Sequence, residues 1–176
     1  MELNVSQLLM EPSGSSREYP LDDPLLLPDG RDAIRVTGTV AMLRTNKSIW
    51  VSAALRSALD CECGRCLTRY SHPIQFQLEE EYIPSLNPLT GARVTPPSDG
   101  SDYYLIDDNH ILDLTEPVRE YVMMSDPMKP LCRSDCAGLC AGCGSDLNHE
   151  QCGCEAARDA RWGPLLELMS GAAETD

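Results

Sequence analysis

The sequence predicts an α+β protein: a β-rich antiparallel sheet or partly closed barrel with a few helices, followed by a small cysteine-bound metal segment at the C-terminus. Three observations carry this prediction. Apolar and polar residues alternate through three stretches between Ile34 and Ile83, which is the period of half-buried strands. The clearest early helical pattern is one short stretch, TEPVREYVMM. Six of the nine cysteines crowd between Cys132 and Cys154.

The elements are predicted in order along the chain. LNVSQLL fits either a strand or one helical turn, and the three prolines of REYPLDDPLLLPDG restrict any strand there to a short or edge position. Alternation then predicts a strand over 34–42, in which Gly38 marks a bulge or a close contact. A longer strand over 49–63 would pair with it as a hairpin, and PIQFQLEEEYI forms a third strand.

The second half of the chain is less regular. A loop rich in proline, glycine and serine covers 84–101, and YYLIDDNHILDL indicates two short strands around a turn. TEPVREYVMM predicts a helix, and EAARDARWGPLLELM predicts a last amphipathic turn or two. We therefore expect a β-rich α+β body over 1–126, and a cysteine-cluster metal-binding segment with a C-terminal helix over 127–176.

The charge balance restricts the classes of partner. The 14 Lys and Arg against 28 Asp and Glu leave a net charge of −14, which disfavours direct binding to RNA and favours basic protein partners or simple solubility. The sequence shows no basic, apolar leader at its start and no apolar run long enough to span a bilayer, so we expect a cytoplasmic protein. In a reducing compartment, dense cysteines indicate metal or redox chemistry.

The C-terminal cysteines have the spacing C-x3-C-x3-C-x2-C-x8-C-x-C. Cys140 and Cys143, followed by a glycine, are the most specific pair, and a thiolate-rich site suits structural zinc. Only three residues separate Cys136 from Cys140, which favours one compact site made of the first four cysteines of the cluster. In the alternative, the C-x-C pair at the end of the cluster takes the place of Cys132 and Cys136. The preferred metal ligands are Cys132, Cys136, Cys140 and Cys143, and the alternative pair is Cys152 and Cys154.

Three further cysteines, Cys61, Cys63 and Cys66, lie at the end of the second predicted strand. The C-x-x-C pair, Cys63 and Cys66, is interpreted first as buried thiols, then as half of a ribbon completed by Cys140 and Cys143, and last as a redox pair; no role is assigned to Cys61.

Several blocks of sequence stand out along the chain, among them CGRCL, LEEEYIP, DDNHILDLTEPVREYV and MKPLCRSDCAGLCAGCGSDLN. In these blocks the chain resembles the YceD family of large ribosomal RNA subunit accumulation proteins. The resemblance implies a part in accumulation or processing of large-subunit ribosomal RNA, favours the first cysteine set, and supplies no catalytic residues. Cys61 lies outside the family pattern.

These observations predict a non-enzymatic factor in biogenesis of the large ribosomal subunit. Its expected partners are ribosomal proteins or assembly factors, with no membrane and no small-molecule substrate. An alternative is a zinc-ribbon regulator or redox-responsive interaction protein that uses Cys152 and Cys154. An RNA-processing nuclease is less favoured, since the three histidines, His72, His110 and His149, are scattered and no carboxylate-bound metal site is evident.

Overall fold

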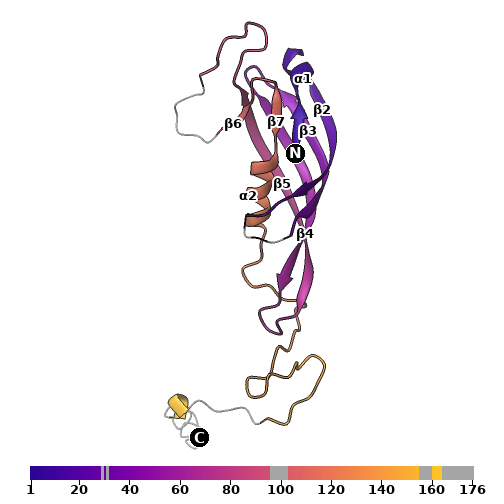
Figure 1. Cartoon of the computed structure of the whole chain (residues 1–176), viewed down its shortest axis with the longest axis vertical. Helices are drawn as coiled ribbons and strands as arrows, with labels where there is room; N and C mark the ends of the chain where they lie inside the picture. The colour runs from indigo at the N-terminus through magenta and orange to yellow at the C-terminus, as the bar shows by residue number, and fades with distance from the viewer. Residues whose placement is uncertain (29, 31, 96–102, 155–159, 164–176) are drawn as a thin grey trace, which may run out of the picture. The chain divides into compact units, whose positions relative to one another are not determined.

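The computed structural model describes residues 1–28, 30, 32–95, 103–154 and 160–163 (Figure 1). The chain divides into two compact units. The body comprises Met1–Cys61 and Tyr70–Met128, and the cysteine unit comprises Glu62–Arg69 and Lys129–Asp176. The cysteine unit therefore includes a turn from the first half of the chain, which the sequence analysis placed within the body.

The body is built on a five-stranded sheet in the order β2-β3-β4-β5-β6. Strands β2 and β3 are antiparallel, as are β3 and β4, whereas β6 runs parallel to β5. The sheet is open, with β2 and β6 at its edges, so the described residues form a mixed sheet and no closed barrel. The strands are β2 (Ser16–Leu25), β3 (Ile34–Arg44), β4 (Ile49–Glu62), β5 (Arg69–Pro84) and β6 (Tyr104–Ile106).

Strand β2 lies at an edge, as its prolines require, but it is ten residues long and not short. An edge strand tolerates proline because one side of the strand needs no ladder hydrogen bonds. On the neighbouring strand, a Cβ added to Gly38 would lie 2.1 Å from the carbonyl oxygen of Ala54. Gly38 therefore marks a close contact between strands, one of the two roles that the sequence suggested for it.

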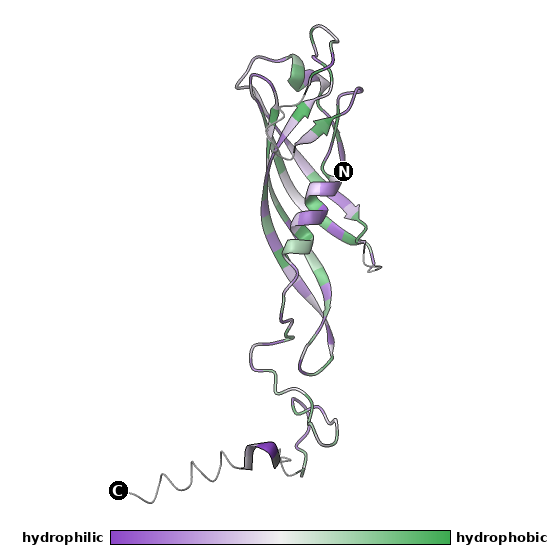
Figure 2. Cartoon of the chain, turned by 90° about the vertical axis from the view of Figure 1, so that its left-hand side faces the viewer, coloured by the Kyte–Doolittle hydropathy of each residue, from purple (hydrophilic) through white to green (hydrophobic). Residues whose placement is uncertain are grey.

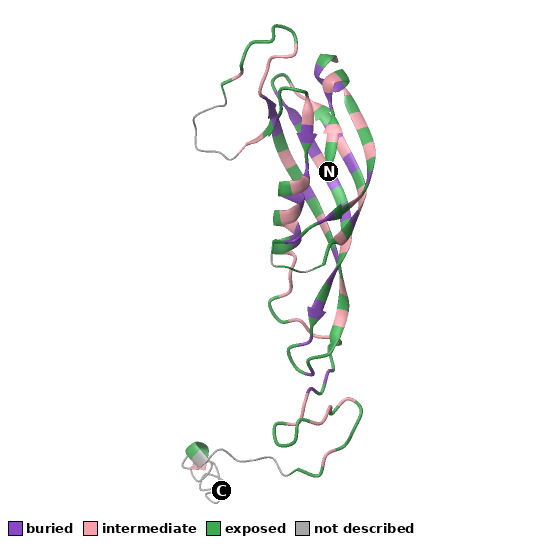
Figure 3. Ribbon diagram, in the orientation of Figure 1, coloured by how far each residue is buried: buried purple, intermediate pink, exposed green. Residues whose placement is uncertain are grey.

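One face of the sheet is buried, and α2 (Thr115–Met124) lies against it (Figure 1). Val118 and Val122 of α2 belong to the same buried core as the strand residues. Buried and exposed residues alternate along the long strands, and hydrophobic and hydrophilic ones do the same (Figures 2 and 3). Phe76 of β5 stacks on Tyr121 of α2 with ring centroids 6.1 Å apart. Aliphatic residues make up most of the remaining core, as expected for a chain with a single phenylalanine.

The N-terminal stretch contains both of its predicted alternatives, in succession. Strand β1 (Glu2–Asn4) pairs antiparallel with β7 (Ile111–Asp113), and α1 (Ser6–Met10) follows it. The predicted strands over 34–42, 49–63 and 73–83 and the helix over 115–124 are confirmed.

Most of the predicted C-terminal helix lies outside the described residues. Within the part that is described, Ala160–Trp162 form a 3-10 turn, η1. Across the part of the chain that the structure describes, none of the helices has the length and apolar content needed to cross a bilayer.

Candidate metal centres

The turn between β4 and β5 folds into a C-x-x-C knuckle, here called the first knuckle (Cys63–Thr68). The amide of Leu67 donates to the carbonyl of Cys63 at 2.9 Å, and the amide of Cys63 donates to the carbonyl of Thr68 at 3.0 Å. These two bonds close a tight loop that holds Cys63 and Cys66 side by side. The last step of the loop requires a positive φ, and Leu67 adopts it with φ 59°.

The second knuckle (Cys140–Ser145) repeats this hydrogen-bond pattern. The amide of Gly144 donates to the carbonyl of Cys140 at 2.9 Å, and the amide of Cys140 donates to the carbonyl of Ser145 at 2.8 Å. The positive φ falls on Gly144, at 77°. In both knuckles a hydroxyl lies beside the second sulfur: Thr68 at 3.4 Å from Cys66 and Ser145 at 3.2 Å from Cys143. The two knuckles are thus the same local structure.

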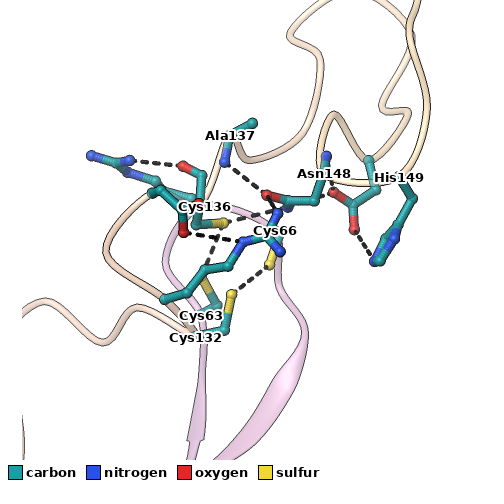
Figure 4. Close-up of polar contacts among 11 residues, drawn as sticks. Cys63, Cys66, Cys132, Cys136, Ala137, Asn148 and His149 are labelled. Atoms are coloured by element: carbon teal, nitrogen blue, oxygen red, sulfur yellow. Dashed lines mark hydrogen bonds and ion pairs between the residues drawn. The ribbon is translucent and has the colours of Figure 1, made fainter.

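Each knuckle is completed by two further cysteines. The first cysteine group consists of Cys63, Cys66, Cys132 and Cys136, and the second consists of Cys140, Cys143, Cys152 and Cys154. Within each group all four sulfurs lie within 4.8 Å of one another. In the first group the sulfurs of Cys63 and Cys136 are 3.8 Å apart, and those of Cys66 and Cys132 are 3.6 Å apart (Figure 4).

These distances fit a tetrahedral metal site. A zinc–sulfur bond of about 2.3 Å in tetrahedral geometry separates the sulfurs by about 3.8 Å, whereas a disulfide brings them to about 2.05 Å. All nine cysteines are free thiols. Four thiolates fill a tetrahedral shell and leave no position for a reacting water, so either group can hold a metal ion in a structural role.

The hydrogen bonds at the sulfurs prepare each knuckle for a cation. The backbone amides of Cys132 and of the knuckle itself lower the pKa of Cys63 to about 6. The amides of Cys143 and Gly142 likewise lower the pKa of Cys140 to about 6. Burial, reinforced by the neighbouring thiols, raises the pKa of Cys132 to about 12. Each knuckle therefore offers one thiolate near neutral pH, and a metal ion would displace the proton from Cys132.

The two groups differ in burial. Three of the four cysteines of the first group are buried, and the fourth, Cys132, is half-buried. In the second group Cys143 and Cys154 are exposed. Both groups belong to the cysteine unit, but solvent reaches them to very different extents.

Asn148 is a positioning residue that the sequence analysis missed. Its side-chain amide nitrogen lies 3.4 Å from the sulfur of Cys136, and its side-chain oxygen accepts the amide of Ala137 at 2.8 Å (Figure 4). The carboxylate of Asp146 orients the same nitrogen at 2.6 Å. Asn148 lies in the loop of the second group and contacts a ligand of the first, so it links the two. Only its place inside the cysteine cluster could have pointed to it.

The preferred ligand set from the sequence is divided between the two groups. Cys132 and Cys136 lie with the first knuckle, where the amide of Gly64 donates to the carbonyl of Pro130 at 2.8 Å and holds the two segments together. Cys140 and Cys143 lie with the alternative pair, Cys152 and Cys154. The cysteine pairs are therefore brought together as 63/66 with 132/136 and as 140/143 with 152/154.

Of the remaining candidate residues, two belong to the first group, and Cys61 and the histidines lie outside both groups. Cys63 and Cys66 are buried, as first interpreted, and they do form half of a composite site, but Cys132 and Cys136 complete it in place of Cys140 and Cys143. Cys61 is buried at the end of β4 within the body. None of the three histidines belongs to either group among the described residues.

Comparison with known proteins identifies the family. A family model described as "Large ribosomal RNA subunit accumulation protein YceD" matches residues 51–169. An uncharacterized protein of Mycobacterium tuberculosis is 28% identical over 155 residues, covering 88% of this chain and 65% of the relative. One from Mycobacterium leprae is 28% identical over 125 residues, covering 71% and 55%.

A third relative is the chloroplastic "Large ribosomal RNA subunit accumulation protein YCED homolog 1" of Arabidopsis thaliana. It is 25% identical over 161 residues, covering 80% of this chain and 50% of the relative. The chain thus spans between half and two thirds of the length of these curated relatives. No solved structure matches the chain significantly.

Proposed function

The chain belongs to the YceD family, and from this premise we propose that it is a non-enzymatic factor in biogenesis of the large ribosomal subunit. In this role it supports accumulation or processing of large-subunit ribosomal RNA. The observation that carries the proposal is the family match over 51–169, which includes most of β4, all of β5 and α2, and every cysteine of the two groups. The Arabidopsis relative is named for accumulation of the large ribosomal RNA subunit, which supports the proposal.

The distribution of charge supports protein partners for the body. The body contains eight Lys and Arg and 19 Asp and Glu, which gives it a net charge of −11. The cysteine unit contains six Lys and Arg and nine Asp and Glu, which gives it a net charge of −3. Ribosomal proteins are basic as a class, and a strongly acidic surface attracts basic partners through long-range electrostatics. We infer that the body holds a ribosomal protein or an assembly factor of the large subunit.

The chemistry of the cysteines supports structural zinc. Eight thiol groups are divided into two sets of four, each with its sulfurs within 4.8 Å of one another, and thiolate-only sites favour zinc. A filled shell has no open position for a substrate or a nucleophilic water. The proposed zinc ions therefore hold the cysteine unit in shape and do not catalyse a reaction.

Affinity purification of the full chain from cells tests the function and the metal together. We expect large-subunit rRNA precursors and ribosomal proteins in the eluate, with about two zinc ions per chain by elemental analysis. The zinc-loaded protein, incubated alone with precursor rRNA, is expected to leave it intact. An eluate without any large-subunit component contradicts the proposed function, and cleavage by the purified protein contradicts its non-enzymatic character.

The exposure of the second cysteine group favours one alternative, a redox-responsive interaction protein. Cys143 and Cys154 are exposed, and solvent-accessible thiolates are the ones that oxidants and alkylating agents reach. Alkylation with and without a zinc chelator tests it. Rapid labelling of the second group in the zinc-loaded protein would support the alternative, and slow labelling that does not depend on the chelator would argue against a switch.

A further inference from the structure

Leu67 combines a strained backbone with an exposed apolar side chain. Its φ of 59° lies in the left-handed region, which is sterically unfavourable for a non-glycine residue because Cβ crowds the following carbonyl. Burial of the side chain does not offset this cost, since Leu67 is 57% exposed. Strain that packing does not explain is typical of residues that contact a partner.

The second knuckle shows what the fold alone requires at this position. Gly144 occupies the equivalent place, with the same hydrogen bond to the first cysteine of the knuckle and a φ of 77°. Glycine adopts this conformation without steric cost. The hydrogen bonds and the sulfur positions of a knuckle therefore do not need a leucine, and the side chain of Leu67 has a role outside the knuckle.

Four cations lie on the two segments that meet at the first knuckle, although the chain as a whole is acidic. Arg65 and Arg69 flank Leu67 in sequence, and Lys129 precedes Pro130, whose carbonyl accepts the amide of Gly64. Arg133 follows Cys132, which belongs to the same cysteine group. The segments 62–69 and 129–136 together hold four Lys and Arg against two Asp and Glu. No basic run in the sequence reveals this surface, since the fold assembles it from two segments.

All four cations are exposed. Arg65 and Arg133 are partly engaged, Arg65 with the carbonyl of Cys136 and Arg133 with Asp135 and Asn148. A zinc ion with four thiolates carries a charge of −2, but those sulfurs lie mostly within the unit. The outer surface of the first knuckle is therefore a local surface of this acidic chain that suits an anionic partner.

We propose that the first knuckle is a contact site for single-stranded RNA. In this proposal, Leu67 packs against an unstacked base while Arg69 and Lys129 contact the phosphates. Single-stranded RNA suits the surface because it presents exposed apolar base faces between regularly spaced phosphates. The choice of RNA over an acidic protein rests on the proposed function. The net charge of −14 argues against binding over the whole surface, but it does not exclude this local contact.

Fluorescence anisotropy of a labelled short single-stranded oligoribonucleotide, titrated with the zinc-loaded full chain, tests the proposal. The variant Arg69→Gln/Lys129→Gln is expected to bind about tenfold more weakly, and its salt dependence should fall by about 0.7 in log–log slope for each cation removed. The matched control is Lys47→Gln/Arg93→Gln, which makes the same change in net charge at exposed positions of the body. It is expected to keep the wild-type affinity.

Leu67→Gly separates the contact from the fold. It removes the side chain and relieves the strain, so the knuckle should be at least as stable while RNA affinity falls about tenfold. Leu67→Met, which keeps an apolar side chain, should retain most of the affinity. A Leu67→Gly protein that binds RNA as well as wild type overturns the role of Leu67.

Two other results overturn the site itself. Equal losses in the knuckle and control double variants would show that only the total charge matters. Competition by polyglutamate as efficient as competition by unlabelled RNA would assign the surface to acidic proteins. Failure of the proposed function can be distinguished from failure of this RNA contact. The first would appear as an affinity purification of the wild-type protein without large-subunit components, whereas the second would appear only in the anisotropy titration.

Discussion

The two cysteine groups share one knuckle structure and differ in how the knuckle is completed. In the first group, the cysteines that complete it lie 66 and 73 positions away in sequence, and most of the sulfurs are buried. In the second, eight residues separate Cys143 from Cys152, and two of the cysteines are exposed. The local motif therefore determines where two thiols meet, and the completing segment determines what the metal stabilises.

The difference in loop length has an energetic consequence. The entropy of closing a loop grows with the logarithm of its length, so closing the first group costs the unfolded chain about 2 kcal/mol more than closing the second. A metal in the first group cross-links segments from the two halves of the chain. A metal in the second group organises one loop. The first should therefore act on the cysteine unit as a whole and the second only locally.

Removal of one ligand from each group should show the largest contrast. Each of the variants Cys136→Ser and Cys143→Ser removes one of the four thiolates of a single group, so we expect the zinc content to fall from about two ions per chain to about one. The structural effect should be large, since structural zinc contributes on the order of 10 kcal/mol of binding energy in small domains. In Cys136→Ser, hydrogen-exchange protection should fall across 62–69 and 129–139. In Cys143→Ser, the loss should be confined to 140–154. Equal loss of protection in the two variants would contradict the comparison.

Substitution of Asn148 should have a smaller effect. This residue lies in the loop of the second group, but its side chain contacts Cys136 of the first group. Asn148→Ala removes the contact of the side chain with the sulfur of Cys136 and the acceptor for the amide of Ala137. Since such supporting contacts orient ligands, we expect about 10- to 100-fold weaker zinc binding at the first group. The second group should be unaffected. Titration with a competing chelator measures both affinities.

Asn109→Ala is the matched control for Asn148→Ala. Asn109 donates its backbone amide and its side-chain nitrogen to Asp107, as Asn148 does to Asp146, but it lies in an exposed turn of the body. It should leave both zinc affinities unchanged. A similar effect of the two substitutions would show that loss of the turn, and not contact with Cys136, weakens the site.

Metal removal should separate the groups in time. Because Cys143 and Cys154 are exposed, a chelator should remove zinc from the second group about tenfold faster than from the first. The time course of zinc release, measured with a colorimetric zinc indicator, should therefore show two phases. The fast phase should be missing in Cys143→Ser. A single phase that comprises both ions would mean that burial does not protect the first group.

Elements with a strong local period could be predicted from the sequence. Ile34–Arg44, Ile49–Glu62 and Thr115–Met124 each follow one period over many residues, and each element has close to its expected bounds. Length was harder where proline interrupts the pattern. The prolines predicted a strand that is short or at an edge, and the structure shows the edge alternative: Pro20 and Pro24 fit within the ten residues of β2 because it lies at the edge of the sheet.

The candidate site was predicted only where its residues are close in sequence. The knuckle Cys140–Ser145 has a recognisable C-x-x-C-G pattern, but spacing cannot say that Cys132 and Cys136 meet Cys63 and Cys66, because that pairing depends on how β4, β5 and the chain after α2 converge. The proximity of the four cysteines in sequence favoured a compact set, whereas the fold joins pairs from distant segments. The cationic surface around Leu67 was missed for the same reason.

Exchange of the residues at the positive-φ positions should give the smallest effect and the sharpest comparison of the knuckles. Gly144→Leu introduces left-handed strain that the fold does not need, and should destabilise the second group by roughly 1–2 kcal/mol. Leu67→Gly should remove a similar strain from the first group, offset in part by the greater freedom of glycine in the unfolded chain. Zinc affinity at each group, measured by chelator competition, should therefore fall for Gly144→Leu and hold or rise for Leu67→Gly. A loss of zinc affinity in Leu67→Gly would mean that the leucine supports its knuckle structurally, and the assignment of its side chain to an external contact would then be wrong.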